Sequence, residues 1–172
     1  NYRPISILST LSKPLEKHLK QNIMSHFTKY NLLHPKQSGF RENHSCHTAL
    51  SSLIEQWHLN INNDLLTGTI FVDFAKAFDT IDHELLLRKF ALYGLSSASL
   101  TLMASFLNNR RQVVYQDSVT SSFLPVKYGV PQGSVLGPIL FSIYIYMTSL
   151  CMFHPSVNCL LMTQLCIIQA KI

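Results

Sequence analysis

Apolar residues recur at helical spacing in two stretches of the first third of the chain. Between residues 11 and 30 they are spaced by four, and between residues 45 and 62 they form one stripe at spacings of three and four. Such spacing predicts two amphipathic helices. The predicted stripes are Leu15, Leu19, Ile23 and Phe27 in the first helix, and Leu50, Leu53, Ile54, Trp57 and Ile61 in the second.

The next part of the chain changes from a strand pattern to a helix pattern. A short apolar run over residues 68–74 predicts a buried strand. Asp79 or Thr80 can cap a helix that runs to Tyr93. Gly94 can close this helix, because glycine readily adopts the left-handed conformation that follows a helix.

The pattern continues with a helix, a hairpin and a loop. A helix is predicted over residues 97–107, and a β-hairpin is predicted with its turn at residues 116–118. The loop 129–134 then leads into an apolar helix. Because helices and strands alternate along the chain, we predict a mixed α/β (α+β) domain.

Charged residues are distributed unevenly along the chain, and one long uncharged stretch could be a membrane-spanning helix. The chain has 14 Lys and Arg against 9 Asp and Glu, and its formal net charge is +5. No charged residue occurs from Tyr128 to Ala170, and the uncharged residues 134–153 are long enough to cross a bilayer. A buried helix has the same pattern. The dipeptide Gly137-Pro138 and scattered Ser, Thr and Tyr favour burial in protein, so we expect no stable membrane association.

The remaining composition is typical of a globular chain from a reducing compartment. With 172 residues, 47% of them apolar, the chain can form one domain or part of a larger one. Its four cysteines contain no C-x-x-C pair, so we expect reduced thiols and no zinc site. The chain begins at Asn1 without a signal peptide, from which we expect an intracellular (nuclear or cytoplasmic) fragment that is not secreted.

Asp73 is a candidate metal ligand at the end of the predicted strand. An acid at the end of an apolar strand is costly to bury unless it is paired or bound to a metal. Its position suits a hard cation such as Mg²⁺, although a solvated strand end is an alternative. Asp79 and Asp82 fit a simpler role as charges at a helix N-terminus.

Two loops carry further candidate residues. In the loop 129–134, two glycines allow a ligand to approach the backbone closely, and Gln132 offers both a donor and an acceptor. The loop 37–41 contains one cation, Arg41. Taken alone, each loop fits a structural turn or a solvated cation equally well.

Five sequence blocks occur in a specific order. They are Tyr2–Ser6, Gln37–Arg41, Phe71–Asp79, Asn109–Val114 and Gly129–Pro138. Together they resemble the reverse transcriptase domain of non-LTR (LINE-type) retrotransposons, from Asn1 to about Tyr144. The resemblance implies the fingers and partial palm of a right-hand polymerase, with helices packed on a small, mostly antiparallel sheet. It divides the chain into a helical fingers-like part (1–66), a partial palm (67–150) and an aberrant tail (151–172).

The resemblance also implies RNA-templated DNA synthesis. The partners of such a domain are an RNA template, a DNA primer and a dNTP, and its cofactors are two Mg²⁺ ions. Asp73 would be the first palm carboxylate, a catalytic residue and metal ligand, with the Phe74 carbonyl assisting. The implied nucleotide-binding residues are Arg41 on the triphosphate with help from Arg3, Phe74, Phe78 under the incoming sugar, and Gln132 with Gly133 lining the site.

The second carboxylate pair of the family is missing. It belongs to a Phe/Tyr-Ala-Asp-Asp hairpin after the apolar helix, but the last acidic residue here is Asp117. Asp73 alone cannot hold two divalent ions, and Asp79 and Asp82 are poor substitutes. One choice of codons for Phe-Ala-Asp-Asp-Thr-Thr-Leu, shifted by one base, spells residues 160–166.

We therefore interpret the tail as frameshifted and expect a truncated, catalytically inactive retrotransposon remnant. Three alternatives remain open. The first is a module that still binds nucleic acid weakly and without sequence preference, the second is an active polymerase completed by another chain, and the third is a membrane-associated helical protein.

Overall fold

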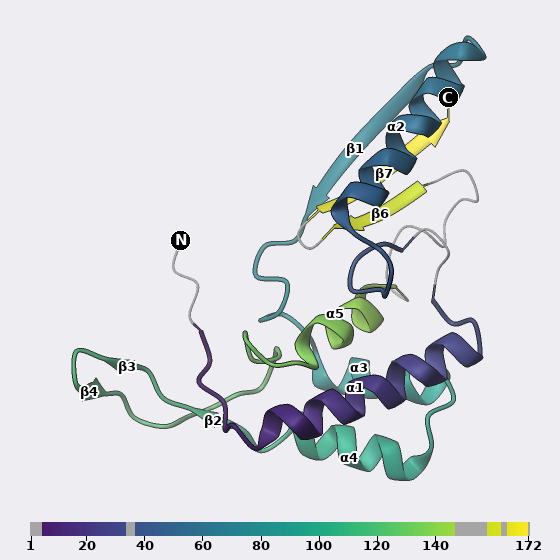
Figure 1. Ribbon diagram of the computed structural model, residues 1–172. Coiled ribbons are helices and arrows are strands. Elements are labelled where there is room, and N and C mark those ends of the chain that lie inside the picture. The colour runs from purple at the N-terminus through teal and green to yellow at the C-terminus, as the bar shows by residue number, and fades with distance from the viewer. Residues whose placement is uncertain (1–4, 34–36, 147–157, 163–164, 172) are drawn as a thin grey trace. The chain divides into compact units, whose positions relative to one another are not determined.

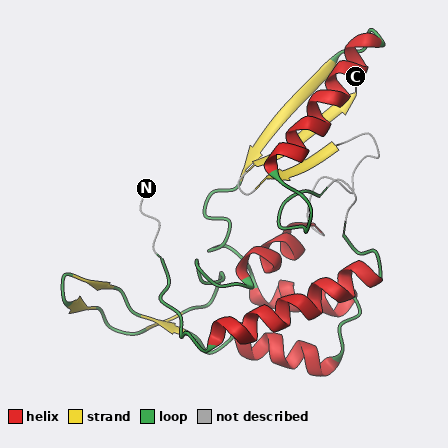
Figure 2. Cartoon of the chain, in the orientation of Figure 1, coloured by secondary structure: helices red, strands yellow, loops and turns green. Residues whose placement is uncertain are grey.

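The computed structural model describes residues 5–33, 37–146, 158–162 and 165–171. The chain forms two compact units. The first unit comprises residues 1–18 and 78–144, and the second comprises residues 19–77 and 145–172. Figure 1 shows the ribbon and Figure 2 its secondary structure.

The second unit contains a three-stranded antiparallel sheet and a helix. The strands are β1 (Thr67–Asp73), β6 (Asn158–Met162) and β7 (Leu165–Lys171), in the order β1-β7-β6 (Figure 1). Helix α2 (Cys46–Asn62) precedes β1. Its N-terminus is stabilised by a capping box, in which the side chains of Ser45 and Thr48 each accept a backbone N–H of the other residue.

Helix α1 (Ser12–Lys29) forms where the four-residue spacing predicts it, but its buried face differs from the predicted stripe. Ile23 and Phe27 are buried, whereas Leu15 is exposed and Glu16 is only 2% exposed. A row of residues spaced by four turns slowly around a helix. Leu15 therefore lies about 120° around the axis from Phe27, whereas Glu16 lies within about 20° of it.

Helix α2 departs from its predicted stripe in the same way. Ala49 and Leu53 are buried, but Leu50, Ile54 and Ile61 are 47%, 41% and 66% exposed. Asn60 is buried instead, and its side-chain amide donates to Thr67 Oγ1 at the start of β1, at 2.8 Å. The boundaries of the helix are confirmed, but the predicted stripe overlaps only part of its buried face.

The first unit packs three helices around one apolar core. These are α3 (His83–Leu92), α4 (Ser97–Leu107) and α5 (Gly137–Tyr146). The predicted helix over 97–107 is confirmed, and Gly94 follows α3 at a φ of +79°, as expected of a glycine after a helix. The fully buried core side chains of this unit are Ile81, Leu86, Phe90, Leu107, Leu136, Leu140 and Ile143.

Helix α3 begins later than predicted. Its N-cap is Asp82, whose carboxylate accepts the Leu85 N–H at 2.8 Å, and neither Asp79 nor Thr80 caps it. The backbone from Phe78 to Ile81 is engaged elsewhere, because Phe78 O accepts Val130 N–H and Ile81 O accepts Gly129 N–H. Carbonyls committed to a distant segment cannot also start a helix.

A two-stranded ribbon connects α4 to the loop before α5. The pair at the base of the ribbon is β2 (Arg111–Gln112) with β5 (Leu124–Pro125). The pair next to the turn is β3 (Tyr115–Gln116) with β4 (Val119–Thr120). The turn lies at Asp117 and Ser118, both at positive φ, as in a type I′ turn. The predicted hairpin is confirmed.

The apolar helix predicted after the loop 129–134 is confirmed as α5, which starts at Gly137. The rest of the uncharged stretch, residues 147–153, lies outside the described residues. In the part of the chain that the structure describes, no helix combines the length and the apolar character needed to cross a membrane. The mixed fold of helices with a small antiparallel sheet agrees with the predicted fold class.

Candidate functional site

The predicted site residues fall into two groups, one in each unit. Phe78, Gln132 and Gly133 belong to the first unit, and Arg41, Asp73 and Phe74 belong to the second. Arg3 lies outside the described residues. The structure brings the first group together within its own unit.

The loop 129–134 lies directly against the backbone of residues 78–81. Gly129 N–H donates to Ile81 O at 2.7 Å, and Val130 N–H donates to Phe78 O at 2.8 Å. Gly129 has a φ of +81°, and a Cβ atom built there would lie 2.8 Å from both Asp79 Cα and Phe78 O. The close approach that this glycine permits is therefore to the protein's own chain.

Gln132 is held at the surface of this loop by contacts on both sides. Its amide nitrogen lies 3.3 Å from Asp79 Oδ1 and 3.4 Å from Oδ2, and its carbonyl accepts the Ser6 N–H at 2.9 Å. Asp79 thus contacts the loop that carries Gln132, which corrects the expectation that it serves as a helix charge. Gly133 is exposed at a φ of +108°, which keeps its backbone accessible.

Phe78 is anchored from the other side by α5. Its ring packs against Phe141 with the ring centroids 5.1 Å apart and the planes tilted by 44°. Phe78 remains half-buried, while Phe141 is buried. The unit therefore presents Phe78, Asp79, Gln132 and Gly133 on two segments joined by backbone hydrogen bonds.

A buried carboxylate that the sequence analysis did not single out supports the same loop. Glu16 Oε2 accepts Val135 N–H at 2.7 Å and Leu136 N–H at 3.2 Å, immediately before α5. Carboxylates stabilise the start of a helix because unpaired N–H groups and positive partial charge gather there. Ser134 Oγ adds a third acceptor, for Gly137 N–H at 2.8 Å.

Arg110 supplies the positive charge that Glu16 faces. Burial lowers the pKa of the Arg110 guanidinium from its usual value, and the charge of Glu16 acts in the opposite direction by raising it. The guanidinium carbon also lies 5.6 Å from the centroid of the Phe106 ring. A partly buried pair of opposite charges thus holds the residues that directly follow the loop 129–134.

Two buried basic side chains of α3, His83 and Lys89, contact neighbouring segments. His83 Nε2 lies 2.7 Å from Gly129 O. Lys89 Nζ donates to Tyr144 O in the last turn of α5, and burial lowers the pKa of this amine from its usual value. The sequence analysis also missed His83, because the sequence does not show whether a histidine in a helix is buried or exposed.

In the second unit, Asp73 ends β1 opposite the tail hairpin. Its backbone pairs in register with Leu165 of β7, and Leu165 pairs with Met162 of β6. The tip of this hairpin, at residues 163–164, lies outside the described residues. The hairpin next to the end of β1 therefore comes from the segment in which the sequence has no acidic residue.

Arg41 follows a loop with an unusual backbone. Phe40 and Asn43 both adopt positive φ, and Gln37 is buried with its amide nitrogen donating to Gly39 O at 3.1 Å. Arg41 itself is half-buried, and its carbonyl accepts the His44 N–H at 3.3 Å. The fold thus fixes the backbone that carries this cation.

Among the residues whose side chains the structure describes, the acidic residues form no cluster that could hold two divalent ions. Hard cations require several oxygen ligands, and carboxylates supply most of them. Among the described residues, no three His, Cys, Asp or Glu side chains gather in one place. The described residues of the hairpin strands β6 and β7 include no Asp or Glu.

Comparison with known proteins identifies the family. Residues 1–157 match the family of reverse transcriptases (RNA-dependent DNA polymerases). The chain is 35% identical over 144 residues to the RNA-directed DNA polymerase from mobile element jockey of Drosophila funebris, and 32% identical to that of Drosophila melanogaster. These alignments cover 84% of this chain but only 16% of each relative.

The fold is also found in a solved structure. Apo telomerase from Candida tropicalis, truncated from its C-terminal domain, superposes with a TM-score of 0.64 at 16% sequence identity. The match covers 94% of this chain and 34% of the telomerase chain, and it shows a shared fold. The chain therefore belongs to the reverse transcriptase family, in the branch of non-LTR retrotransposons that its five sequence blocks resemble.

Proposed function

We propose that this chain is a domain of an intracellular RNA-directed DNA polymerase from a LINE-like element. The observation that carries the proposal is the hydrogen-bonded junction between residues 78–81 and the loop 129–134. It places Gln132 within hydrogen-bond distance of Asp79, so two sequence blocks that are far apart in the chain form one surface. In the parent protein this surface binds the incoming dNTP, above an RNA template and a DNA primer.

The predicted site residues of each unit have distinct roles in the parent enzyme. Gln132 and the exposed backbone of Gly133 line the nucleotide site, and Phe78 supports the sugar while Phe141 holds its ring in place. Arg41 holds the triphosphate, because a guanidinium pairs well with phosphate oxygens. The carboxylate of Asp73 and the carbonyl of Phe74 are the metal ligands of the parent enzyme.

We further propose that this chain no longer transfers nucleotides. In the parent family, two Mg²⁺ ions stabilise the attacking and leaving oxygens. Asp73 would have to hold both ions with no second carboxylate pair in the hairpin that pairs with β1. Binding two divalent ions through one carboxylate leaves most of their charge uncompensated by the protein, so no catalytic step is assigned to this chain.

A primer-extension assay tests this proposal. With an RNA template, a DNA primer, all four dNTPs and either Mg²⁺ or Mn²⁺, the unmodified chain is expected to add no nucleotides. Asp73→Ala serves as the control and is expected to give the same blank result. Extension that depends on Mg²⁺ and is lost in Asp73→Ala would instead show an active enzyme, for example one completed by a second chain.

Restoring the missing carboxylates gives a matched gain of function. The variant Leu160→Phe, Leu161→Ala, Met162→Asp, Thr163→Asp is expected to bind Mn²⁺ at least tenfold more tightly than the unmodified chain, since carboxylates are the main ligands of hard cations. Isothermal titration measures this difference, and equal affinities would contradict the proposed position of the lost pair. The coding DNA across residues 157–172, read in all three frames, tests the frameshift itself.

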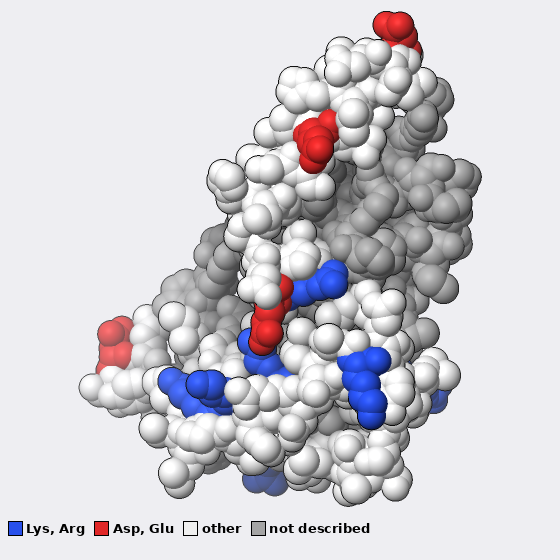
Figure 3. Space-filling view, turned by 45° about the vertical axis from the view of Figure 1, so that its right-hand side comes forward, with Lys and Arg blue, Asp and Glu red and all other residues white. Residues whose placement is uncertain are grey.

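Residual binding of nucleic acid is a second candidate function. The observation in its favour is the basic balance, with 14 Lys and Arg against 9 Asp and Glu. On the face shown in Figure 3, however, the described cations form no continuous patch, since uncharged surface separates most of them and an acidic side chain lies between two of them near the centre. Binding without sequence preference would therefore be weak and salt-dependent, and binding that is absent at low salt would exclude it.

A further inference from the structure

The β-ribbon between α4 and the loop 129–134, residues 110–127, is anchored to the first unit at its base by the half-buried Arg110, and the rest of it projects from the unit. Every residue from 111 to 125 is exposed. A two-stranded ribbon is at best marginally stable in water unless something covers it. This ribbon also exposes large apolar side chains, namely Val113, Val114, Tyr115, Val119, Phe123 and Leu124.

The ribbon is irregular at the position of Phe123. Gln112 pairs with Leu124, and Tyr115 pairs with Thr120, so two residues on one arm (113–114) lie opposite three on the other (121–123). The extra residue forms a bulge around Ser122 and Phe123, where Val114 N–H donates to the Ser121 hydroxyl at 2.9 Å. Bulges redirect side chains, and the Phe123 ring is 70% exposed.

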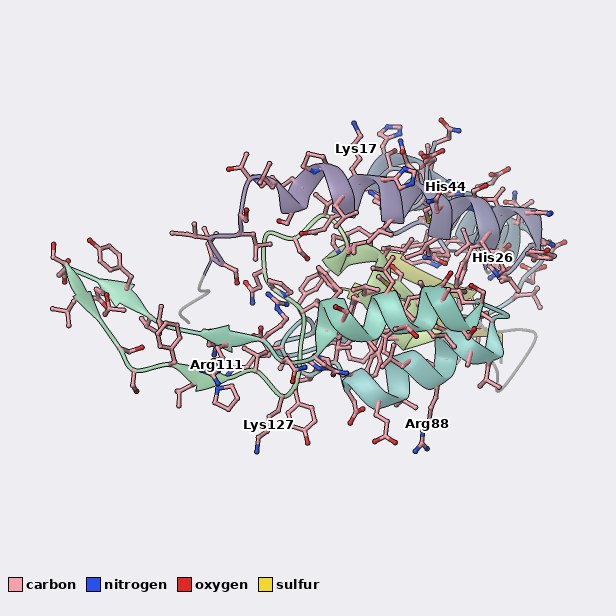
Figure 4. All side chains as sticks on the ribbon, turned by 90° about the horizontal axis from the view of Figure 1, so that it is seen from below. Lys17, His26, His44, Arg88, Arg111 and Lys127 are labelled. Atoms are coloured by element: carbon pink, nitrogen blue, oxygen red, sulfur yellow. The ribbon has the colours of Figure 1, made fainter. Side chains whose placement is uncertain are left out.

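Cations and aromatic rings occur together on the ribbon. Arg111 and Lys127 are exposed on its two arms, as Figure 4 shows, and Tyr115 and Phe123 are exposed further towards the tip. The single acidic residue between positions 110 and 127 is Asp117, in the turn. Exposed rings with neighbouring cations are the combination by which proteins bind single-stranded nucleic acid, through base stacking and phosphate pairing.

The exposed face of α2 lacks this combination. Its exposed large apolar residues, Leu50, Ile54, Leu59 and Ile61, are all aliphatic, and the helix contains no Lys or Arg. Nothing on that face indicates what would cover it. The ribbon is different, because its positive charge favours binding of a polyanion and its aromatic rings can stack on bases.

We propose that the ribbon 110–127 holds a single strand of RNA or DNA without sequence preference. The inference rests on the proposed function, since it assigns a specific surface to the nucleic acid that the polymerase domain handles. Tyr115 and Phe123 stack on bases, and Arg111 and Lys127 pair with phosphates. The ribbon lies outside the predicted nucleotide site and does not depend on the missing carboxylates.

Charge variants test the phosphate contacts. Binding of a fluorescent oligo(U) RNA and of oligo(dT) is measured by anisotropy over a range of salt concentrations, using the 172-residue chain. Arg111→Gln with Lys127→Gln is expected to lower the slope of log affinity against log salt by about 1.4, or about 0.7 for each lost contact. The control, Lys17→Gln with Arg88→Gln, removes the same charge at exposed sites away from the ribbon and is expected to change the slope little (Figure 4).

Ring variants test the stacking. Tyr115→Leu with Phe123→Leu keeps the ribbon apolar but removes both rings, and is expected to weaken binding roughly fivefold or more for each ring. Tyr30→Leu, at an exposed tyrosine outside the ribbon, is the control and is expected to bind like the unmodified chain. Circular dichroism confirms that the variants fold.

The outcomes separate this inference from the proposed function. If the chain binds both oligonucleotides and the ribbon variants bind equally well, the ribbon proposal is wrong while residual binding stands. If the unmodified chain does not bind either oligonucleotide at low salt, the ribbon proposal and residual binding of nucleic acid are both wrong, while the assignment to a polymerase domain is unaffected. If the chain forms dimers by light scattering and Tyr115→Ser with Phe123→Ser abolishes the dimer without affecting RNA binding, the ribbon is a self-association surface and the proposal is overturned.

Discussion

Gly129→Ala is expected to lower the free energy of unfolding by about 2–5 kcal/mol, the sum of a left-handed backbone and a steric clash. At a φ of +81°, an alanine is strained wherever it is placed. Its Cβ would also lie 2.8 Å from Asp79 Cα and Phe78 O, and 2.9 Å from Asp79 O. These are backbone atoms, which cannot rotate away, so the hydrogen bonds from Gly129 and Val130 to residues 78–81 must break or stretch.

Gly94→Ala provides the matched control. Gly94 has almost the same φ, +79°, but a Cβ built there meets nothing within 4 Å. Its replacement is expected to cost only about 1–2 kcal/mol, the conformational part alone. Urea unfolding followed by circular dichroism compares the two variants. Equal losses of stability would mean that residues 78–79 move away from the new Cβ atom at position 129 without loss of folding free energy.

The glycine at position 129 shows what the sequence could and could not predict. A glycine-rich loop before an apolar helix allows another group to approach the backbone closely, and such an approach occurs at Gly129. The sequence suggested a ligand as the approaching group, whereas the structure places the protein's own residues 78–79 there. A glycine in the sequence indicates that another group can lie close to the backbone, but it does not indicate whether that group is a ligand or another part of the protein.

Element boundaries were predicted more accurately than helix faces. Caps and turns act over three or four residues, so Gly94 and the turn at 116–118 could be recognised from the sequence, although the N-cap of α3 was placed at Asp79 or Thr80 and not at Asp82. The buried face of a helix depends on which other elements pack against it. Since an error of one residue turns a helix by about 100°, the apolar stripes of α1 and α2 were each only partly buried.

The candidate site divides in the same way. The assignments of Asp73, Arg41, Phe78, Gln132 and Gly133 come from family resemblance, and they stay predictions. The residues that support the loop 129–134 were missed, because a glutamate or a histidine in an amphipathic helix normally faces water. One sign for Glu16 was available: it lies nearly in line with Phe27 on the helix, while Leu15 does not.

Glu16→Ala is expected to lower the free energy of unfolding by about 2–4 kcal/mol. The substitution leaves the N–H groups of Val135 and Leu136 without their acceptor at a buried position. It also removes the negative charge that faces the partly buried Arg110. Alanine is a better helix former than glutamate, so the loss comes from these tertiary contacts and not from α1 itself.

The control is another glutamate on a helix of the same unit. Glu84 pairs with Arg88 on the surface of α3, where both side chains are more than 70% exposed. Glu84→Ala is expected to cost less than about 1 kcal/mol, because solvent screens such a pair. Thermal and urea unfolding measure both variants, and hydrogen exchange at the amides of Val135 and Leu136 should accelerate only in Glu16→Ala. Unchanged stability and exchange in that variant would mean that the loop carrying Gln132 and Gly133 is held without Glu16.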